Sequence, residues 1–325
     1  MGAARSEHGK RAGGARRALI LAALALAARA GAQPPVDTAR TFAAGPVSET
    51  AIVAALGGAH TDRFHPVGST SVVFQVDLAG PIDAAFKPES HLHPRGWLSE
   101  VAAYRIGREL NLDDVPPAVL RSIDRGQLRR RLDPDDGVVF DELAADIVFT
   151  GQLARGSFIY WVPGLGRSDL DTPAGIERWS AWLARGGEIP AEDRELARDI
   201  SNMLVFDYLI GNRDRWSGGN VRPAEGGRRL VIRDHNLAFP AVLPASAHLR
   251  MVQFLCRARR FSRQTVRRLE ALDEASLRLV LETEEPRMLL DDRQIAGVLS
   301  RRETLRSYLG ALVETYGEHA VLFFD

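Results

Sequence analysis

Lysine is rare in this chain of 325 residues: it occurs only as Lys10 and Lys87, although Lys and Arg together number 42. Lys87 closes the apolar stretch Ala84-Ala85-Phe86 and is followed by Pro88. An ammonium is a compact point charge, whereas a guanidinium is a planar fork, so a lone Lys among arginines indicates a position that needs the ammonium. The alternative is the chance survival of one lysine.

Glu100 follows Lys87 within a predicted helix. A lysine on a strand can bind the α- and β-phosphates of a nucleotide while a helix glutamate holds it in place. The alternative is that Glu100 is an ordinary solvated helix residue. Upstream, Gly68-Ser69-Thr70-Ser71 forms a turn of small residues, which would let backbone N–H groups approach phosphate oxygens.

Two acidic segments lie in the second half of the chain. An apolar helix is predicted to end in a polar loop, in which Asp214 could accept the proton of an incoming hydroxyl and Asn220 could bind a divalent ion. Asp234 directly follows a buried-looking strand, where a carboxylate is costly unless it is paired or binds metal, and it suits Mg²⁺ or Mn²⁺. The alternative for the loop is a surface turn with helix-capping Asp and Asn.

The elements that position these residues change in character along the chain. Apolar and polar residues alternate over 72–78, which predicts a strand, and further strands are expected at 82–87, 147–150, 157–162 and 230–232. A loop or hairpin tip is expected at 124–137. Helices are predicted at 47–56, 97–110, 176–184, 192–210, 263–272, 274–282 and 291–316. Strands first and helices later predict an α+β fold with two lobes.

The order of these motifs resembles a known group of kinases. Ala-Ala-Phe-Lys-Pro, Ser-Glu-Val-Ala-Ala-Tyr-Arg-Ile and Val-Pro-Pro-Ala-Val-Leu resemble the N-lobe of the bacterial phosphatidylinositol 3/4-kinase-like group. Phe-Asp-Tyr-Leu-Ile-Gly-Asn-Arg-Asp-Arg, followed by Asp234, resembles the catalytic and metal loops of that group and of secretory-pathway kinases of the Fam20 and Four-jointed type. The similarity spans roughly residues 64–240.

The resemblance implies a two-lobed protein-kinase-like fold, with an antiparallel sheet and a helix in an N-lobe at 59–163 and a mostly helical C-lobe at 164–325. It implies that ATP binds with Mg²⁺ or Mn²⁺. Lys87 would contact phosphate and pair with Glu100, Asp214 would be the catalytic base, and Asn220 and Asp234 would bind metal. The Gly68–Ser71 turn would cover the phosphates, and a hinge made of Tyr160, Trp161 and Val162 would hold adenine through its backbone.

Two features depart from the family pattern. Trp216 stands where these families usually have His after Asp-Arg, and Asn220 comes six residues after Asp214, one more than usual. The extra residue falls in Ser217-Gly218-Gly219, where glycines can absorb it because they tolerate left-handed backbone conformations.

The N-terminus predicts export. A basic run is followed by an apolar stretch at 18–28 and by Ala30-Gly31-Ala32, which is typical of a signal peptide at 1–32, with a linker and short helix at 33–58. Residues 1–32 hold six basic residues and one acid, so the remainder has 36 basic and 41 acidic residues, a net charge of −5. That balance argues against a nucleic-acid partner, and no internal run is long enough for a transmembrane anchor.

The sequence thus predicts an exported, periplasmic or extracellular kinase that phosphorylates a hydroxyl acceptor, with a protein favoured. Three alternatives stay open: a nucleotide-binding pseudokinase that acts as a binding module, a lipid or small-molecule kinase, and a metallohydrolase built on His60, His65, His91 and His93. The single Cys256 cannot form an internal disulfide and is expected to be a buried thiol.

Overall fold

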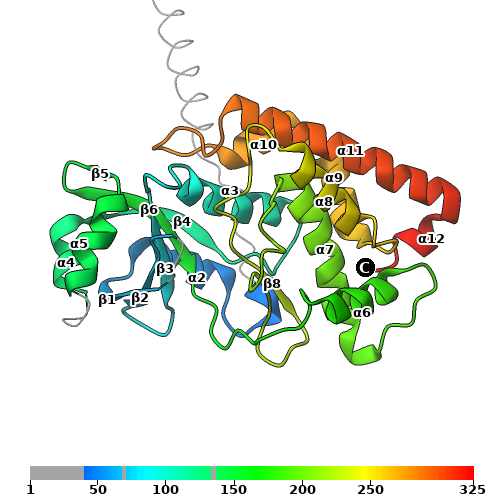
Figure 1. Ribbon diagram of the computed structural model, residues 1–325, viewed down its shortest axis with the longest axis horizontal. Coiled ribbons are helices and arrows are strands. Elements are labelled where there is room, and N and C mark those ends of the chain that lie inside the picture. The colour runs from blue at the N-terminus through cyan, green and yellow to red at the C-terminus, as the bar shows by residue number, and fades with distance from the viewer. Residues whose placement is uncertain (1–39, 68–70, 133–136) are drawn as a thin grey trace, which may run out of the picture. The chain divides into compact units, whose positions relative to one another are not determined.

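An antiparallel sheet forms the N-terminal part of the molecule, at the left of Figure 1. The computed structural model describes residues 40–67, 71–132 and 137–325. The strand order is β1-β2-β3-β6-β4, with β5 paired to β6. The strands are β1 (Thr61–Pro66), β2 (Phe74–Leu78), β3 (Ala84–Pro88), β4 (Ala118–Asp124), β5 (Phe149–Thr150) and β6 (Leu153–Tyr160).

The two faces of the sheet differ because successive side chains on a strand point to opposite sides. On β3, Phe86 joins an aromatic cluster whose ring centroids lie 5.1 to 6.3 Å apart, whereas Ala85 belongs to the core shared with the helical part. Lys87 is one residue beyond Phe86, so its side chain shares the Ala85 face. The strand alternation therefore directs Lys87 toward the helical part.

Gly156 on β6 allows the close approach of β3 at this position. A Cβ added there would lie 2.6 Å from the backbone oxygen of Lys87 and 2.9 Å from the Cα of Pro88. Gly156 is the register partner of Pro88, and Ser157 is the partner of Lys87. Any side chain at 156 would therefore push apart the two strands that place Lys87.

Four helices accompany the sheet: α2 (Glu49–Gly58), α3 (Gly96–Glu109), α4 (Arg125–Arg130) and α5 (Gly137–Asp146). The prediction of a loop over 124–137 was wrong for residues 125–130. The Asp124 side chain accepts a hydrogen bond from the Gln127 N–H at 2.9 Å, which caps and stabilises the start of α4. The structure does not describe residues 133–136.

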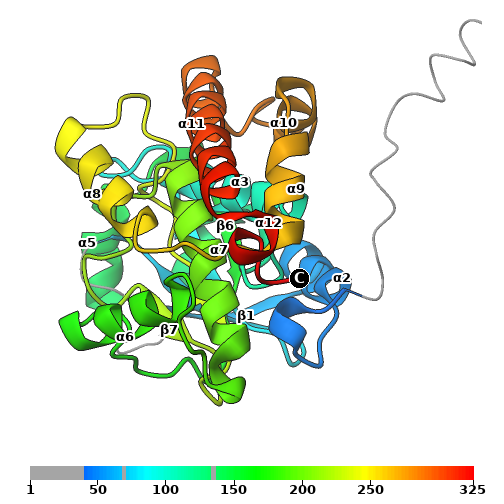
Figure 2. The ribbon, with the colours of Figure 1, turned by 90° about the vertical axis from the view of Figure 1, so that its right-hand side faces the viewer.

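The C-terminal part is mostly helical (Figures 1 and 2). A two-stranded sheet of β7 (Val221–Pro223) and β8 (Leu230–Ile232) precedes most of these helices. The helices are α6 (Pro173–Leu183), α7 (Arg194–Ile210), α8 (Ala245–Leu255), α9 (Arg263–Ala271), α10 (Glu274–Leu281), α11 (Asp292–Tyr316) and α12 (Glu318–Val321), with single 3₁₀ turns at Phe42–Ala44 and Ala191–Asp193. The predicted α+β class, with an antiparallel N-terminal sheet and a helical C-terminal part, is confirmed.

Helix α3 is fixed from both sides. The Tyr104 hydroxyl donates to Glu49 of α2 at 2.5 Å, and Arg105 donates to the backbone oxygens of Val280 and Glu282 at 3.0 and 2.7 Å. Glu49 is itself buried and pairs with Arg108 at 3.0 Å. The helix that carries Glu100 is thus tied to α2 on one side and to the end of α10 on the other.

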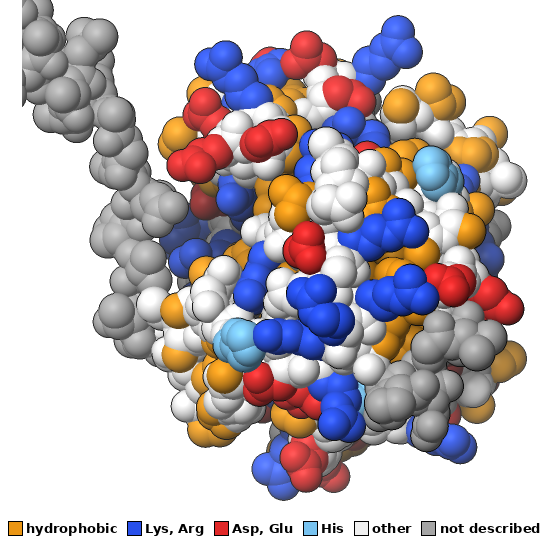
Figure 3. Space-filling model, turned by 90° about the vertical axis from the view of Figure 1, so that its left-hand side faces the viewer, with side chains coloured by type: hydrophobic (Ala, Val, Ile, Leu, Met, Phe, Trp, Pro, Cys, Tyr) orange, Lys and Arg blue, Asp and Glu red, His pale blue; other side chains and the backbone are white. Residues whose placement is uncertain are grey.

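Charged side chains of both signs lie on the outer end of the sheet region. Figure 3 shows Lys and Arg side chains across the middle of this face, with acidic and apolar side chains around them. Within the described residues, no helix has the length and apolar character needed to cross a membrane. The predicted signal peptide at 1–32 lies outside the described residues.

Candidate nucleotide and phosphotransfer site

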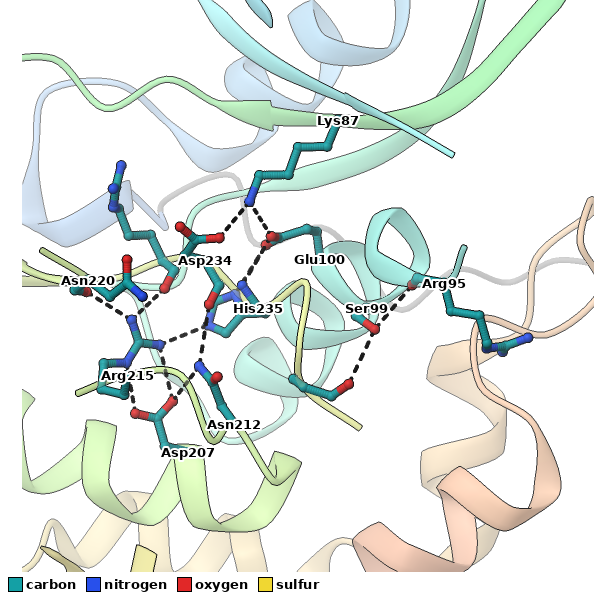
Figure 4. A network of polar contacts seen from close by, with 12 residues as sticks. Lys87, Arg95, Ser99, Glu100, Asp207, Asn212, Arg215, Asn220, Asp234 and His235 are labelled. Carbon is teal, nitrogen blue, oxygen red and sulfur yellow. Dashed lines mark hydrogen bonds and ion pairs between the residues drawn. The ribbon is translucent and has the colours of Figure 1, made fainter. Parts of the chain in front are cut away.

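Lys87 meets two carboxylates from distant parts of the chain. Its Nζ donates to Glu100 Oε1 at 2.6 Å and to Asp234 Oδ1 at 2.7 Å, as Figure 4 shows. Burial alone would lower the pKa of Lys87, but the two carboxylates outweigh it and raise that pKa. The ammonium is therefore charged at any physiological pH. The structure brings together these three residues, which the sequence analysis selected separately.

Glu100 is held by a partner that the sequence analysis missed. The side chain of Glu100 is 2 % exposed, and it accepts the His235 backbone N–H at 3.0 Å. The Nδ1 atom of His235 lies 3.3 Å from Glu100 Oε2. Burial would raise the pKa of Glu100, but Lys87 and then His235 outweigh it and lower that pKa. The carboxylate is thus kept ionised and oriented toward Lys87.

Asp234 leaves the end of β8 in an unusual backbone conformation. All three β8 residues are buried, and Asp234 has a φ of +67°, in the left-handed region where Asp is tolerated better than most residues. The Lys87 ammonium is the main cause that lowers the pKa of Asp234, against the opposing effect of burial. The side chain is still 30 % exposed, so this carboxylate can be reached from solvent.

A buried ion pair supports the loop after α7. Arg215 Nε donates to Asp207 Oδ2 at 2.8 Å, and Arg215 Nη2 donates to Asp207 Oδ1 at 3.1 Å. Burial would lower the pKa of Arg215, but Asp207 outweighs it and the pKa is raised. The same guanidinium donates to the backbone oxygens of Asn220 and Arg233. Arg215 therefore joins the Asp214 loop to the strand that precedes Asp234.

Asn212 joins Asp207 to the segment of Asp234 in the network of Figure 4. Its Nδ2 lies 3.2 Å from Asp207 Oδ1 and 3.3 Å from the Asp234 backbone oxygen. Its Oδ1 accepts the Asp214 backbone N–H at 3.3 Å. Neither Asp207, Asn212 nor Arg215 was predicted as a site residue. The signal available in the sequence was the polar Asn-Arg-Asp-Arg run itself, but its partners depend on the tertiary fold.

Asn220 contacts Asp214 directly. Its Nδ2 donates to Asp214 Oδ2 at 3.1 Å and to the Asp214 backbone oxygen at 3.0 Å. Gly218 and Gly219 have φ values of +103° and +77°, and the Gly219 N–H donates to Asp171 at 3.0 Å. The two glycines thus accommodate the longer spacing, and they do so in conformations that other residues rarely adopt.

Trp216 lies in an aromatic stack. Its ring is 4.1 Å from that of Phe254, with an interplanar angle of 3°, and 5.6 Å from that of Trp179. The residue that replaces the usual His is therefore a packing residue on the helical part. It turns away from the Lys87 cluster toward α6 and α8.

The remaining predicted nucleotide contacts are described only in part. Gly68, Ser69 and Thr70 lie outside the described residues, whereas Ser71 lines a small hollow of about 20 Å³ together with Lys87, His93 and Asn236. In the predicted hinge, the Tyr160 N–H donates to Pro117 and the Trp161 N–H donates to Asp83, at 2.8 and 3.0 Å. The Val162 N–H makes no hydrogen bond to another described residue, so of the three predicted hinge residues it alone keeps a backbone donor available within the described part of the chain.

The residues present fit a divalent ion that also binds phosphate. Asp234 supplies a carboxylate that solvent can reach, and the Asn220 amide nitrogen faces Asp214, which leaves its carbonyl oxygen as a ligand. Mg²⁺ commonly takes one or two protein oxygens and completes its shell with phosphate and water. No group of three His, Cys, Asp or Glu side chains in the described part of the chain could hold a metal alone.

The histidines of the metallohydrolase alternative do not converge among the described residues. His65 Nε2 lies 3.1 Å from Asp77 Oδ2, and His60 lies 3.9 Å from Asp62. Cys256 is half-buried at the end of α8, so it is less enclosed than predicted.

The fold is similar to solved kinase structures. The structure of hydra Fam20 with sugar superimposes with a TM-score of 0.62 and 17% identity, covering 88% of this chain and 96% of that chain. The Golgi casein kinase gives a TM-score of 0.60 and 16% identity, covering 84% of this chain and 77% of that chain. A structure of the Golgi casein kinase with Mn/ADP bound gives 0.59 and 15%, covering 83% and 77%.

No protein-family model matches the chain, and no curated protein matches its sequence. The structural likeness therefore shows the fold: the chain has a protein-kinase-like fold of the Fam20 type. The three superimposed structures do not include a phosphatidylinositol 3/4-kinase, so that part of the resemblance stays a prediction.

Proposed function

We propose that this protein is an exported kinase that transfers the γ-phosphoryl group of ATP to a hydroxyl acceptor, with a protein as the favoured acceptor and Mg²⁺ or Mn²⁺ as the metal. One observation carries the proposal: Lys87, the only lysine after residue 10, bridges Glu100 and Asp234 within a kinase-like fold. Kinases need a phosphate-binding lysine paired with a helix glutamate and a metal-binding aspartate nearby, and this arrangement matches that need.

Each residue has a proposed role in the transfer. Lys87 binds phosphate oxygens and offsets their charge, and Glu100 holds the ammonium in place. Asp214 accepts the proton of the acceptor hydroxyl as the oxygen bonds to the γ-phosphorus and the bond to the β–γ bridging oxygen breaks, which releases ADP. Asp234 and Asn220 would hold the metal ion, which when bound neutralises phosphate charge.

A nucleotide-binding pseudokinase is the second candidate. It is favoured by the contact of Asn220 with the Asp214 carboxylate at 3.1 Å and by Trp216 in place of His. In this arrangement the amide occupies an oxygen that the transfer mechanism assigns to the acceptor proton. The same fold would then bind nucleotide without transfer.

Labelled ATP separates these functions. The protein would be incubated with Mg²⁺ or Mn²⁺, exported proteins as acceptors, and ATP labelled at either the γ or the α phosphate. Transfer of the γ label identifies a kinase, and transfer of the α label identifies adenylyl transfer. Nucleotide-dependent thermal stabilisation without transfer identifies a pseudokinase. Asp234→Ala is expected to weaken metal-dependent nucleotide binding, and an unchanged response would remove Asp234 from the metal site.

Export is proposed on the residues at 1–32 alone. Fusion of this segment to a reporter enzyme that is active only outside the cytoplasm tests it directly. Retention of the fusion in the cytoplasm would contradict the proposed periplasmic or extracellular location.

A further inference from the structure

Arg233 stands between the last residue of β8 and Asp234, and its side chain has no partner. The side chain is half-buried, its Nε is buried without a hydrogen bond, and its guanidinium makes no hydrogen bond or ion pair to another described residue. Arg stays charged in proteins, and withdrawing a cation from water without a counter-charge costs free energy. An anion bound beside Arg233 would offset that cost.

The alternation of β8 sets the direction of the Arg233 side chain. Leu230 and Ile232 belong to the core of the helical part, whereas Val231 between them belongs to the apolar core of the sheet. Successive side chains of an extended segment point to opposite sides, so Arg233 shares the side of Val231. Its guanidinium therefore extends toward the sheet, which is the side from which Lys87 reaches Asp234.

The predicted hinge and Lys87 lie at opposite ends of β3. Tyr160, the first hinge residue, pairs with Ala84, and Lys87 comes three residues later. At about 3.3 Å per residue, the two ends are about 10 Å apart. A nucleotide with its base at the hinge and its outer phosphates beside Lys87 would therefore have its ribose and α-phosphate between these ends.

Arg233 covers the same interval from the opposite wall. Val231 belongs to the apolar cluster against which the hinge residue Val162 packs. Asp234 accepts a hydrogen bond from Lys87 at 2.7 Å, and Figure 4 shows these two side chains turned toward each other. Arg233 lies between Val231 and Asp234 in the chain, so it faces the middle of the interval.

The backbone of Arg233 is held in place before a ligand binds. Its carbonyl oxygen accepts a hydrogen bond from Arg215, whose guanidinium is fixed by both oxygens of Asp207. The neighbouring Asp234 carboxylate is bonded to Lys87, and Lys87 first, then Arg233 to a smaller extent, lower the pKa of Asp234. Arg233 thus acts on Asp234 without pairing with it, and its donors stay available.

From these features we infer that Arg233 is a second cation of the nucleotide site and binds the α-phosphate. A guanidinium can give two parallel N–H groups to two oxygens of one phosphate, and such charge-assisted hydrogen bonds are stronger than neutral ones. Lys87 would share the phosphate chain with Arg233, which holds the end next to the ribose. The inference rests on the proposed nucleotide site and adds to it a residue that the sequence analysis did not select.

Arg233→Met tests the contact, because Met keeps a long unbranched side chain and removes the charge. The Kd values of the full chain for adenosine, AMP and ADP would be measured by isothermal titration in the presence of Mn²⁺. We expect the variant to bind AMP and ADP about tenfold more weakly than the wild type and adenosine equally well, since a charge-assisted hydrogen bond is lost. Arg233→Lys keeps the charge but not the fork and should fall between the two.

Arg228→Met is the matched control, since Arg228 is exposed on the turn between β7 and β8 and should leave all three Kd values unchanged. In Arg233→Met, an equal loss for adenosine and AMP would overturn the inference. A loss for ADP without a loss for AMP would overturn the assignment to the α-phosphate. Urea unfolding midpoints check folding, and Arg233→Gln repeats the test if the methionine variant is destabilised.

Binding and transfer together separate this inference from the proposed kinase function. A phosphate-dependent loss of affinity in Arg233→Met, in a protein that transfers no label, would overturn the kinase and keep the Arg233 contact. Transfer of the γ label, with AMP and ADP affinities unchanged in Arg233→Met, would overturn the contact and keep the kinase. A wild-type protein that binds none of the three ligands would overturn both.

Discussion

The two ion pairs of the site, one made by Lys87 and one by Arg215, differ in exposure and in the separation of their residues along the chain. Lys87 and its partner Asp234 have side chains that are 15 % and 30 % exposed, and they come from positions 147 residues apart. Arg215 and Asp207 are 0 % and 9 % exposed and only eight residues apart. The first pair joins the sheet to the helical part, and the second pair closes a single loop on its own helix.

The difference separates contacts that can exchange from contacts that are permanent. An ammonium can leave a carboxylate for a phosphate oxygen without losing a fixed geometry, which suits a residue that must receive a nucleotide. The guanidinium fork satisfies both oxygens of a buried carboxylate at once, which suits a scaffold. The rare lysine stands at the proposed nucleotide contact, and an arginine, the common basic residue of the chain, stands at the scaffold contact.

The largest expected effect is on stability and comes from the Arg215–Asp207 pair. Arg215→Ala would leave Asp207 buried without its cation, and we expect a loss of about 3 to 5 kcal/mol in the free energy of unfolding, measured by urea denaturation. Arg228→Ala, at an exposed position, is the control and should change little. A loss below about 1 kcal/mol for Arg215→Ala would mean that the pair is not a scaffold.

The next largest expected effect is on the rate of phosphoryl transfer. Asp214→Ala should lower kcat about a hundredfold or more, because general base catalysis contributes at least that much, and it should leave nucleotide binding largely intact. Label transfer and thermal shift measure the two quantities. Asp62→Ala, far from the loop in sequence and exposed, serves as the control. Unchanged transfer would remove Asp214 from the mechanism.

Substituting Arg for Lys87 and Lys for Arg215 tests the comparison of the two ion pairs directly. Lys87→Arg should lower transfer about tenfold while changing the free energy of unfolding by less than about 1 kcal/mol, since the charge remains but the fork cannot occupy the place of the ammonium. Arg215→Lys should have the opposite effect on stability: it should lower the free energy of unfolding, because one of the two bonds to Asp207 is lost. Similar losses of stability in both variants would contradict the distinction between exchangeable and permanent contacts.

The smallest expected effect is pH-dependent and comes from the buried carboxyl group of Asp114. Both carboxyl oxygens of Asp114 are buried without a hydrogen bond among the described residues. Burial, then Asp199 and Asp113, raise the pKa of Asp114 well above its usual 3.8. The folded protein therefore keeps a proton that the unfolded chain releases above about pH 4, so this group lowers stability as pH rises.

Asp114→Asn should remove that slope. Above pH 4 the free energy of unfolding of the variant should exceed that of the wild type by a margin that grows with pH, by at most about 1.4 kcal/mol per pH unit. Urea unfolding at several pH values measures the margin, and Asp62→Asn at an exposed position is the control. A margin that shrinks as pH rises would show that Asp114 is ionised in the folded state.

Much of the site could be predicted from short-range patterns in the sequence. Period-two alternation located β2, and Lys87 was placed at the end of the next strand. The helix stripe at 97–110 placed Glu100 on α3, and a polar residue directly after a buried strand marked Asp234. These inferences depend on neighbouring residues only, which is why the sequence supported them.

What the sequence did not show depends on long-range structure. β1 was not predicted because a bulge between Thr61 and Arg63 interrupts its alternation, and its burial pattern is irregular. The partners of Arg215 and Asn212, and the contact of His235 with Glu100, are set by how separate segments meet. α8 was also missed, although its Phe254 stacks on Trp216 of the loop that carries Asp214.

The anchoring of α3 has a consequence for control of the proposed kinase. Tyr104 and Arg105 tie this helix to segments before and after it in the chain, and Glu100 is buried between Lys87 and His235. Rotating the helix outward would break all of these bonds together, so a dormant state reached by that movement would be costly. We expect such a protein to be ready to work as soon as it is folded, with its output governed by where it is delivered and by which nucleotides and acceptors it encounters there.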